Sequence, residues 1–242
     1  MDRLKQDLRY GIRMLVKKPL FTAVVILSLA LCIGANTAVF SIVNAVLLQP
    51  YPHINTDSWV YIWEKPQNEG LSQVSASIVN FRDWKAQNRS FSDMVLWQPY
   101  SYSLSGSGTG APEIITAAVV TPDLFTALDL VPAAGRMLND SDGKQGPQYV
   151  AVISYGLWKR RFGGDPNLVG KTINLNLVPH TVVGVAPQGF SFPAENKIDV
   201  WTLFPASAIN SSTDRAYRGF RIAGKLKPGV TVKQAQADMD VI

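Results

Sequence analysis

Cysteine and histidine are scarce in this sequence, and their scarcity excludes several kinds of chemistry. There is one cysteine, Cys32, and there are two histidines, His53 and His180. A single cysteine cannot form an internal disulfide or a multi-thiolate metal site. Two isolated histidines far apart in the sequence are a poor basis for a metal site or for acid–base catalysis. We therefore expect both histidines to be structural, and we expect no metal or other cofactor.

Catalytic and nucleotide-binding motifs are also missing. There is no GxSxG motif, and Ser154 before Tyr155 and Gly156 fits a helix N-cap better than a nucleophile. The glycine-rich stretch SGSGTGAPE at 105–113 lacks both the GxGxxG spacing and the GK[ST] of a phosphate loop. We interpret it as the tip of a hairpin. The sequence thus predicts a protein that is not an enzyme.

An excess of positive charge is missing from most of the chain. Residues 1–18 contain six basic and two acidic residues, whereas the remainder contains 17 basic and 16 acidic residues. A nucleic-acid-binding domain needs a basic face of its own. The near balance after residue 18 therefore argues against nucleic acid as a partner.

Charge is absent altogether from residues 20–48, a run of 29 residues. A helix of that length measures about 44 Å, and the hydrocarbon core of a bilayer is about 30 Å thick. A cleaved signal peptide has an apolar core of only about 7–15 residues, and a type IV pilin-like leader would carry an acidic residue in the run. We therefore predict an uncleaved transmembrane helix over residues 19–48.

Basic residues precede this run and predict its orientation. Arg13, Lys17 and Lys18 lie on its N-terminal side, so the positive-inside rule places residues 1–18 in the cytoplasm and residues 49–242 on the outer side. Within the first segment, apolar residues recur at helical spacing: Leu4, Leu8, Ile12 and Leu15. This pattern is typical of an amphipathic helix lying along the inner membrane surface. A frayed cytoplasmic tail is the alternative.

The predicted membrane helix carries small and polar residues that a simple anchor does not need. At 100° per residue, Asn36, Thr37, Ser41 and Asn44 share an arc of about 140°. Small residues, including Gly34 and Ala38, lie beside this arc. Small residues let membrane helices approach closely, and polar ones seek partners that lipid does not offer. We predict that this stripe packs against other membrane helices. A solitary anchor with harmless polar residues is the alternative.

Residues 49–242 show a mixture of strand and helix signals, which predicts an α+β domain. The strand candidates are 58–63, 113–120, 149–154, 171–176, 180–186 and 220–226. The helix candidates are 77–90 capped by Ser77, 121–128 capped by Thr121, 154–164 ending at glycine, and 231–242 capped by Thr231. We expect the six tryptophans to pack mainly in the core. Because the last helix stops without a C-cap, we also expect the domain to be incomplete.

Several stretches together resemble one family. The segment LKQDLRYGIRMLVKKPLFTAVVILSLALCIGANTAVFSIVNAVLLQPYP resembles the start of MacB/FtsX-type ABC transporter permeases, in the subgroup with a duplicated permease core. The stretches NFRDWKAQNRSFSDM, VTPDLFTALDLVPAAGRML, VAVISYGLWKRRFGGDPNLVGKTINLN, HTVVGVAPQGFSFP and GKLKPGVTVKQAQADMD resemble the MacB-like periplasmic core domain of that family. One departure is LVPH at 177–180, where the family commonly has a glycine-containing turn.

The resemblance implies an inner-membrane protein with a cytoplasmic N-terminus and a periplasmic main domain. It implies a cytoplasmic ABC ATPase subunit as partner, together with other permease helices or a second permease copy, the lipid bilayer and a periplasmic adaptor. The leading hypothesis is a permease subunit, or its N-terminal part, that couples this ATPase to the periplasmic domain for export or mechanotransmission. A single-span interaction or regulatory module without transport of its own is the alternative. A membrane-tethered enzyme is a further hypothesis. It would need a cluster of acid, base or nucleophilic groups, and the sequence shows none.

Overall fold

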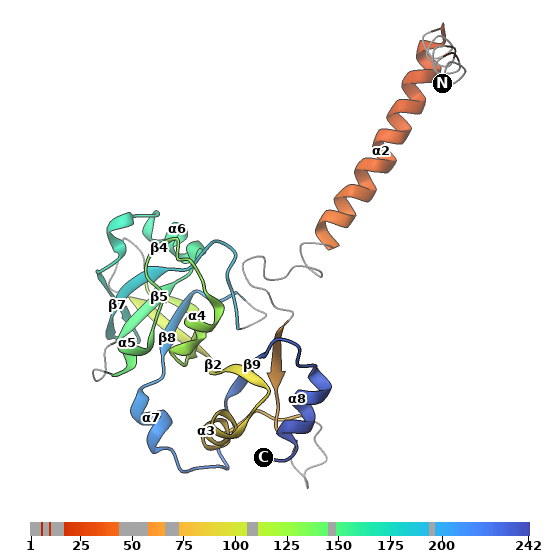
Figure 1. Ribbon diagram of the computed structural model, residues 1–242. Coiled ribbons are helices and arrows are strands. Elements are labelled where there is room, and N and C mark those ends of the chain that lie inside the picture. The colour runs from red at the N-terminus through yellow and green to blue at the C-terminus, as the bar shows by residue number, and fades with distance from the viewer. Residues whose placement is uncertain are drawn as a thin grey trace. The chain divides into compact units, whose positions relative to one another are not determined.

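A computed structural model describes residues 6, 10, 17–43, 58–65, 73–105, 111–144, 149–193 and 197–242. The chain divides into two compact units, Met1–Pro50 and Tyr51–Ile242. In the first unit the described structure is essentially one long helix. In the second it is a mixed sheet with helices (Figure 1).

The first unit contains helix α2 (Pro19–Val43). Proline suits the first turn of a helix because its missing N–H has no partner there in any case. Thr22 donates both its backbone N–H and its hydroxyl to the Lys18 carbonyl, each over 3.0 Å. The predicted helix over 19–48 is thus confirmed to residue 43, and 44–48 lie outside the described residues. Most of the predicted amphipathic helix in residues 1–18 also lies outside the described residues.

The second unit contains nine strands in one sheet, counted over its described residues. The order is β1-β9-β2-β3-β8-β5-β7-β4, and β6 pairs with β2 and β7. The strands are β1 (Trp59–Ile62), β2 (Phe91–Ser105), β3 (Glu113–Val120), β4 (Ala134–Gly135), β5 (Val150–Ile153), β6 (Thr172–Leu175), β7 (Val178–Val185), β8 (Val200–Leu203) and β9 (Arg221–Leu226). The helices are α3 (Ile78–Gln87), α4 (Asp123–Leu128), α5 (Asp140–Lys144), α6 (Tyr155–Phe162), the 3₁₀ helix η3 (Pro166–Leu168), α7 (Ala206–Ser211) and α8 (Val232–Met239).

One end of the sheet is a split βαβ unit. Strand β9 pairs antiparallel with β1 on one side and with β2 on the other, so β1 and β2 run parallel with α3 as their crossover. Helices α3 and α8 pack on the same face. Ile78 and Ala235 from these helices share a buried cluster with Met94 and Ile222 from the strands.

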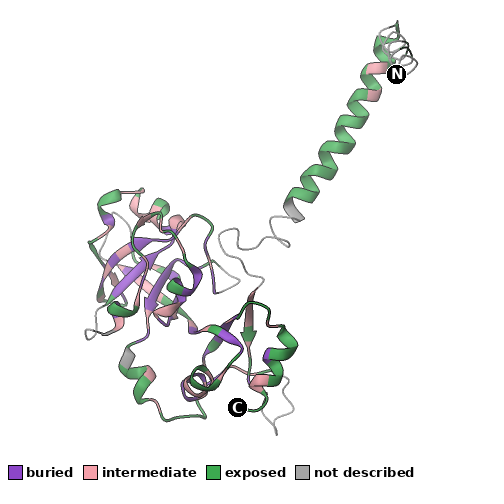
Figure 2. Cartoon of the chain, in the orientation of Figure 1, coloured by how far each residue is buried: buried purple, intermediate pink, exposed green. Residues whose placement is uncertain are grey.

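The rest of the sheet has a core on each face. Along β5, Val150 and Val152 belong to one buried cluster, and Ala151 and Ile153 belong to another. This alternation follows from the two-residue period of a strand. Both faces of β5 are therefore covered, and Figure 2 shows buried residues concentrated along the strands.

Strand β2 is shared by the two ends of the sheet. Its first part, Phe91 to Trp97, pairs with β9, and its second part, Trp97 to Leu104, pairs with β3. Leu104 and Ser105 also pair with β6. A single strand of 15 residues thus holds the βαβ unit and the larger part of the sheet together.

Helix caps predicted from the sequence are confirmed at three helices. The Ser77 hydroxyl accepts the Asn80 N–H over 3.1 Å, and the Ser154 hydroxyl accepts the Leu157 N–H over 3.0 Å. Thr231 forms a capping box with Gln234 at the start of α8. Each cap satisfies N–H groups that the first helical turn leaves without a partner.

The predicted cap of α4 is wrong. The helix begins at Asp123 after Pro122, and no side chain caps it. The Thr121 hydroxyl instead accepts the backbone N–H of Leu96 on β2 over 3.1 Å. The Thr121 side chain therefore connects the end of β3 to the neighbouring strand β2.

The two predicted hairpins are confirmed. Strands β2 and β3 pair antiparallel up to Leu104 and Glu113, although the tip at 106–110 lies outside the described part. Strands β6 and β7 pair antiparallel around Asn176 and Leu177, whose φ angles are 51° and 67°. The turn thus uses the left-handed backbone region without a glycine.

Candidate functional site

Helix α2 is the first candidate site because it has the length and composition of a membrane span. The candidate span is Pro19–Ser41, with a mean hydropathy of 2.2. Its 23 residues extend over about 35 Å, which exceeds a hydrocarbon core of about 30 Å. Its apolar residues are exposed almost throughout (Figure 2), so their side chains need lipid or other helices around them.

The predicted packing stripe lies on this helix. Gly34, Asn36, Thr37, Ala38 and Ser41 are all exposed within α2. A Cβ atom added at Gly34 would meet nothing within 4 Å. Because glycine has no side chain, another membrane helix can approach α2 closely at Gly34. Packing through the stripe remains a prediction, and Asn44 lies outside the described residues.

The orientation charges lie just before α2. Lys17 and Lys18 are exposed, and Arg13 lies outside the described part of the chain. The only cysteine, Cys32, is exposed within α2. Cys32 is therefore a natural labelling position inside the apolar segment.

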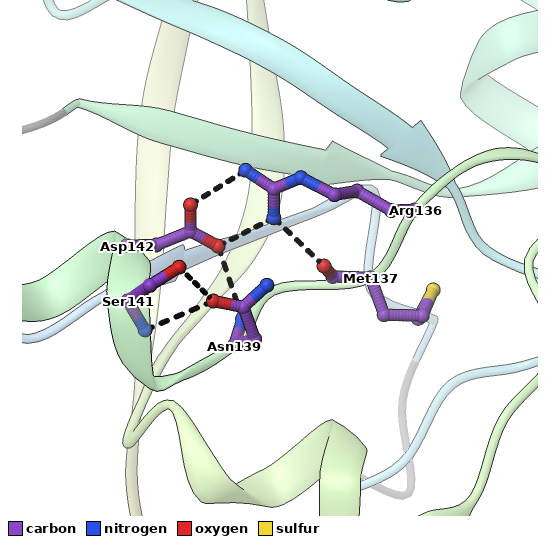
Figure 3. Close-up of polar contacts among 5 residues, drawn as sticks. All are labelled: Arg136, Met137, Asn139, Ser141 and Asp142. Carbon is purple, nitrogen blue, oxygen red and sulfur yellow. Dashed lines mark hydrogen bonds and ion pairs between the residues drawn. The ribbon is translucent and has the colours of Figure 1, made fainter.

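In the second unit, the buried carboxylate of Asp142 on α5 accepts from several donors (Figure 3). Arg136 donates to both carboxylate oxygens over 2.6 Å, and the Asn139 N–H donates to one of them over 3.0 Å. Burial raises the pKa of Asp142, but these donors outweigh it and hold the pKa below its usual range. A fully paired carboxylate is a structural clamp and not a free acid or base.

A second buried carboxylate fastens the start of α3. Glu64 accepts the Ser77 N–H over 3.0 Å and the Asn80 side-chain amide over 2.6 Å. Arg218 forms an ion pair with it over 2.8 Å. These contacts join the segment after β1, the N-terminus of α3 and the segment before β9, so Glu64 also has a structural role.

The described histidine is structural. The Nδ1 atom of His180 lies 2.9 Å from the Val178 carbonyl oxygen and donates to it, since a carbonyl only accepts. Burial lowers the pKa of His180 below its ordinary value, against the effect of that carbonyl. Within the described ranges no group of three or more His, Cys, Asp or Glu side chains could hold a metal ion. His53 lies outside those ranges.

Tryptophan packs mainly in the core, as predicted. Trp97 and Trp201 are fully buried, and Trp59, Trp84 and Trp158 pack against the buried clusters. Trp63 differs because 40% of its surface is exposed. It lines two clefts, one of about 1060 Å³ beside α8 and one of about 780 Å³ beside β2 and β3.

Residues 22–242 match the family described as the MacB-like periplasmic core domain. The chain belongs to this family. The match confirms the family predicted from the sequence, whose members are domains of ABC-type transporter permeases. A comparison with curated proteins gives no match.

Solved structures show the same fold. The periplasmic region of MacB from Actinobacillus actinomycetemcomitans is 17% identical, with a TM-score of 0.57 over 78% of this chain and 83% of that chain. The extracellular domain of the noncanonic ABC-type transporter YknZ from Gram-positive bacteria is 16% identical, with a TM-score of 0.56 over 75% of this chain and 90% of that chain. The predicted mixed α/β fold of a MacB-like domain is therefore confirmed.

Sequence reasoning missed both the Arg136–Asp142 clamp and the clefts. Arg136 follows β4 and Asp142 lies on α5, and a spacing of six residues matches neither the helical nor the strand period. The clefts join residues from β1, β2 and β3 with the segment before β8 or with α8. Patterns in a single sequence indicate only local periodicity, so they cannot predict contacts between segments this far apart in the chain.

Proposed function

We propose that this chain is a permease subunit, or the N-terminal part of one, in an ABC-type export or mechanotransmission system. In this proposal a separate cytoplasmic ATPase supplies the energy. Helix α2 carries motion across the membrane, and the second unit engages cargo or an adaptor on the outer side. The chain itself binds no ATP and makes or breaks no bond.

The observation that carries the proposal is the extent of the family match. It begins at residue 22, within α2, and continues to residue 242, so the membrane helix and the outer domain belong to one family unit. A continuous helix of 25 residues is stiff along its axis. Such a helix suits rigid-body coupling between the two sides of a membrane.

Co-isolation tests the proposal. The chain carries a C-terminal affinity tag in its own cells, and the membranes are dissolved in mild detergent before capture. We expect a cytoplasmic ABC ATPase in the isolated complex. The rate of ATP hydrolysis by this ATPase should be lower when it is assayed without the chain. Capture of a full-length permease without an ATPase would instead favour the single-span regulatory module.

The intact mass of the endogenous protein refines the proposal. A mass near 26.5 kDa would mean that other chains supply the remaining permease helices. A mass several times larger would mean that the residues described here are the front of a complete permease. Either result is compatible with coupling to an ATPase, but each predicts a different partner for the stripe on α2.

A further inference from the structure

The cleft beside β2 and β3 lies on the sheet face opposite α3 and α8. Tyr61 and Arg221 line it, and they alternate along their strands with Ile62 and Ile222. Ile62 and Ile222 pack in the cluster that contains residues of α3 and α8. Because neighbouring residues of a strand point to opposite faces, Tyr61 and Arg221 face away from these helices. The cleft has a volume of about 780 Å³, which is large enough for one small molecule.

Exposed aromatic side chains form one part of this cleft. Tyr61 and Trp63 are 39% and 40% exposed, and their ring centroids are 6.4 Å apart. The Tyr61 hydroxyl donates to the Pro193 carbonyl over 2.6 Å, which fixes its ring. Pro99 and Tyr100 also line the cleft. Fixed aromatic rings offer a large contact area at a small cost in conformational entropy.

Two cations form the other part. The Arg221 guanidinium lies over the ring of buried Trp97, 4.9 Å from its centroid. This stacking orients Arg221 without neutralising it. Lys197 also lines the cleft, and it borders a smaller cleft of about 410 Å³ at the start of α6. Neither cation forms an ion pair with any residue that the structure describes.

No acidic side chain is among the described residues that line the cleft. Asp199 lies nearby, but its carboxylate pairs with Arg160 over 3.7 Å, and the neighbouring Thr116 hydroxyl donates mainly to the Lys197 carbonyl over 2.7 Å. Counted over the described residues, the charge at Arg221 and Lys197 is therefore positive. This charge would repel a cationic ligand, and an uncharged ligand would form no charged contact with either side chain.

We propose that this cleft binds one molecule of an anionic amphiphile. Its head group lies at Arg221 and Lys197, and its apolar body lies against Tyr61 and Trp63. This inference does not depend on the proposed coupling to an ATPase, so either can fail without the other.

The test uses the full chain in nanodiscs of phosphatidylcholine, labelled with 5-fluorotryptophan. The Trp63 signal is assigned by its loss in Trp63→Phe. The probe is 1-anilinonaphthalene-8-sulfonate, and its uncharged analogue N-phenyl-1-naphthylamine has the same ring system without the sulfonate. The Trp63 signal reports binding at the cleft even when the probe also enters the nanodisc lipid.

We expect the sulfonate probe to shift the Trp63 signal and to bind at least tenfold more tightly than the uncharged analogue. The double variant Lys197→Gln, Arg221→Gln should lose about tenfold or more in affinity, since each cation contributes a charged contact. The matched control is Lys233→Gln, which removes an exposed charge on α8 outside the cleft. It should bind the probe like the parent.

Three results would overturn the proposal. The first is equal affinity for the charged and uncharged probes. The second is unchanged affinity in the double variant. The third is a Trp63 signal that ignores the probe but shifts when the nanodisc contains phosphatidylglycerol, which would assign the surface to a membrane instead of a single bound molecule.

Discussion

Leu177 occupies a backbone conformation that favours glycine, at the turn between β6 and β7. Its φ angle is 67°, and that of the preceding Asn176 is 51°. Asparagine tolerates this region, and the Asn176 side chain also accepts the Ser103 N–H over 2.8 Å. Leucine has no comparable compensation, because 84% of its surface is exposed. The departure from a glycine-containing turn, noticed in the sequence, therefore has a local cost in free energy.

Leu177→Gly should increase the free energy of unfolding by about 1 kcal/mol, because glycine adopts this region without steric strain. The measurement is urea unfolding of the full chain in detergent micelles, followed by tryptophan fluorescence. Val131→Gly is the control, since Val131 is also exposed but has no positive φ angle. This control should not increase the free energy of unfolding. A lower stability for Leu177→Gly would show that the leucine side chain makes a stabilising contact.

Asp142→Asn should reduce the free energy of unfolding at pH 7 by about 2 kcal/mol, because it weakens the charged contacts with Arg136. The folded-state pKa of Asp142 is lowered, so its contribution is present above the unfolded pKa of about 3.9. That contribution is lost as the pH falls through the folded pKa. The difference between parent and variant should therefore shrink below about pH 4.

Urea unfolding at several pH values measures this difference. Asp129→Asn is the control, since Asp129 forms no ion pair in the described part of the chain and asparagine tolerates its positive φ angle. The free energy of unfolding of this variant should match that of the parent at every pH. A difference for Asp142→Asn that stays constant down to pH 2 would contradict the assigned ionisation.

At the scale of elements, β4 and β7 approach each other closely because β7 has glycine at position 184. A Cβ atom at Gly184 would lie 1.9 Å from the Arg136 carbonyl oxygen. The register between β5 and β7 shifts between Ala151 and Val152, next to this glycine. Such an irregularity bends the strand locally. Here the bend accompanies the close contact between β7 and the segment after β4.

Gly184→Ala should therefore reduce the free energy of unfolding by at least about 2 kcal/mol, as overpacking against backbone does. Gly156→Ala is the matched control, since its Cβ atom would meet its nearest neighbours at 3.5 Å. The control should change stability by less than about 0.5 kcal/mol. Circular dichroism during thermal unfolding compares the two. Equal stability of both variants would refute the close approach.

The stripe on α2 gives a prediction for this helix. Asn36→Leu should weaken its association with partner membrane helices by about 1 kcal/mol, which is about a fivefold loss of co-isolated permease chain. Val24→Leu is the control, because Val24 lies about 120° from Asn36 around the helix, outside the arc of polar residues. Quantitative mass spectrometry of the captured complex measures the recovery. Full recovery with Asn36→Leu would favour the solitary anchor.

The elements that the sequence predicts best are those with local signals. Helices α3, α6 and α8 were predicted from their caps, and β6 and β7 from alternation. Strand β2 was missed although it has 15 residues, because it is rich in serine and contains Pro99. Pairing with β9 ends at Trp97, so the proline nitrogen meets no strand on that side. Strand β8 was missed because three of its four residues are buried, so it shows no alternation of apolar and polar residues.

For the whole molecule, the sequence predicts the membrane topology more directly than the arrangement of the sheet. The apolar run and the basic residues before it predict one span and its orientation. Strands β1 and β9 pair although one begins at Trp59 and the other at Arg221. Pairs so far apart leave no periodic signal in a single sequence, so the strand order and the clefts could not be predicted.

The predicted orientation can be tested by labelling. On a Cys32→Ser background, Lys233→Cys should react with a membrane-impermeant maleimide in intact spheroplasts, because residue 233 is exposed on the second unit and the predicted orientation places that unit outside. Gln6→Cys, also at an exposed position, should react only after the cells are broken. Mass shifts on denaturing gels measure both reactions. The reverse pattern would contradict a cytoplasmic N-terminus.

The pairing of β2 with both ends of the sheet also determines how the second unit unfolds. Its backbone amides are divided between hydrogen bonds to β9 and hydrogen bonds to β3 and β6. If either end of the sheet melts, half of β2 loses its partners and the cores on both sides of it are opened to water. The βαβ unit and the rest of the sheet therefore form one cooperative unit, whose most protected amides exchange with solvent only through global unfolding.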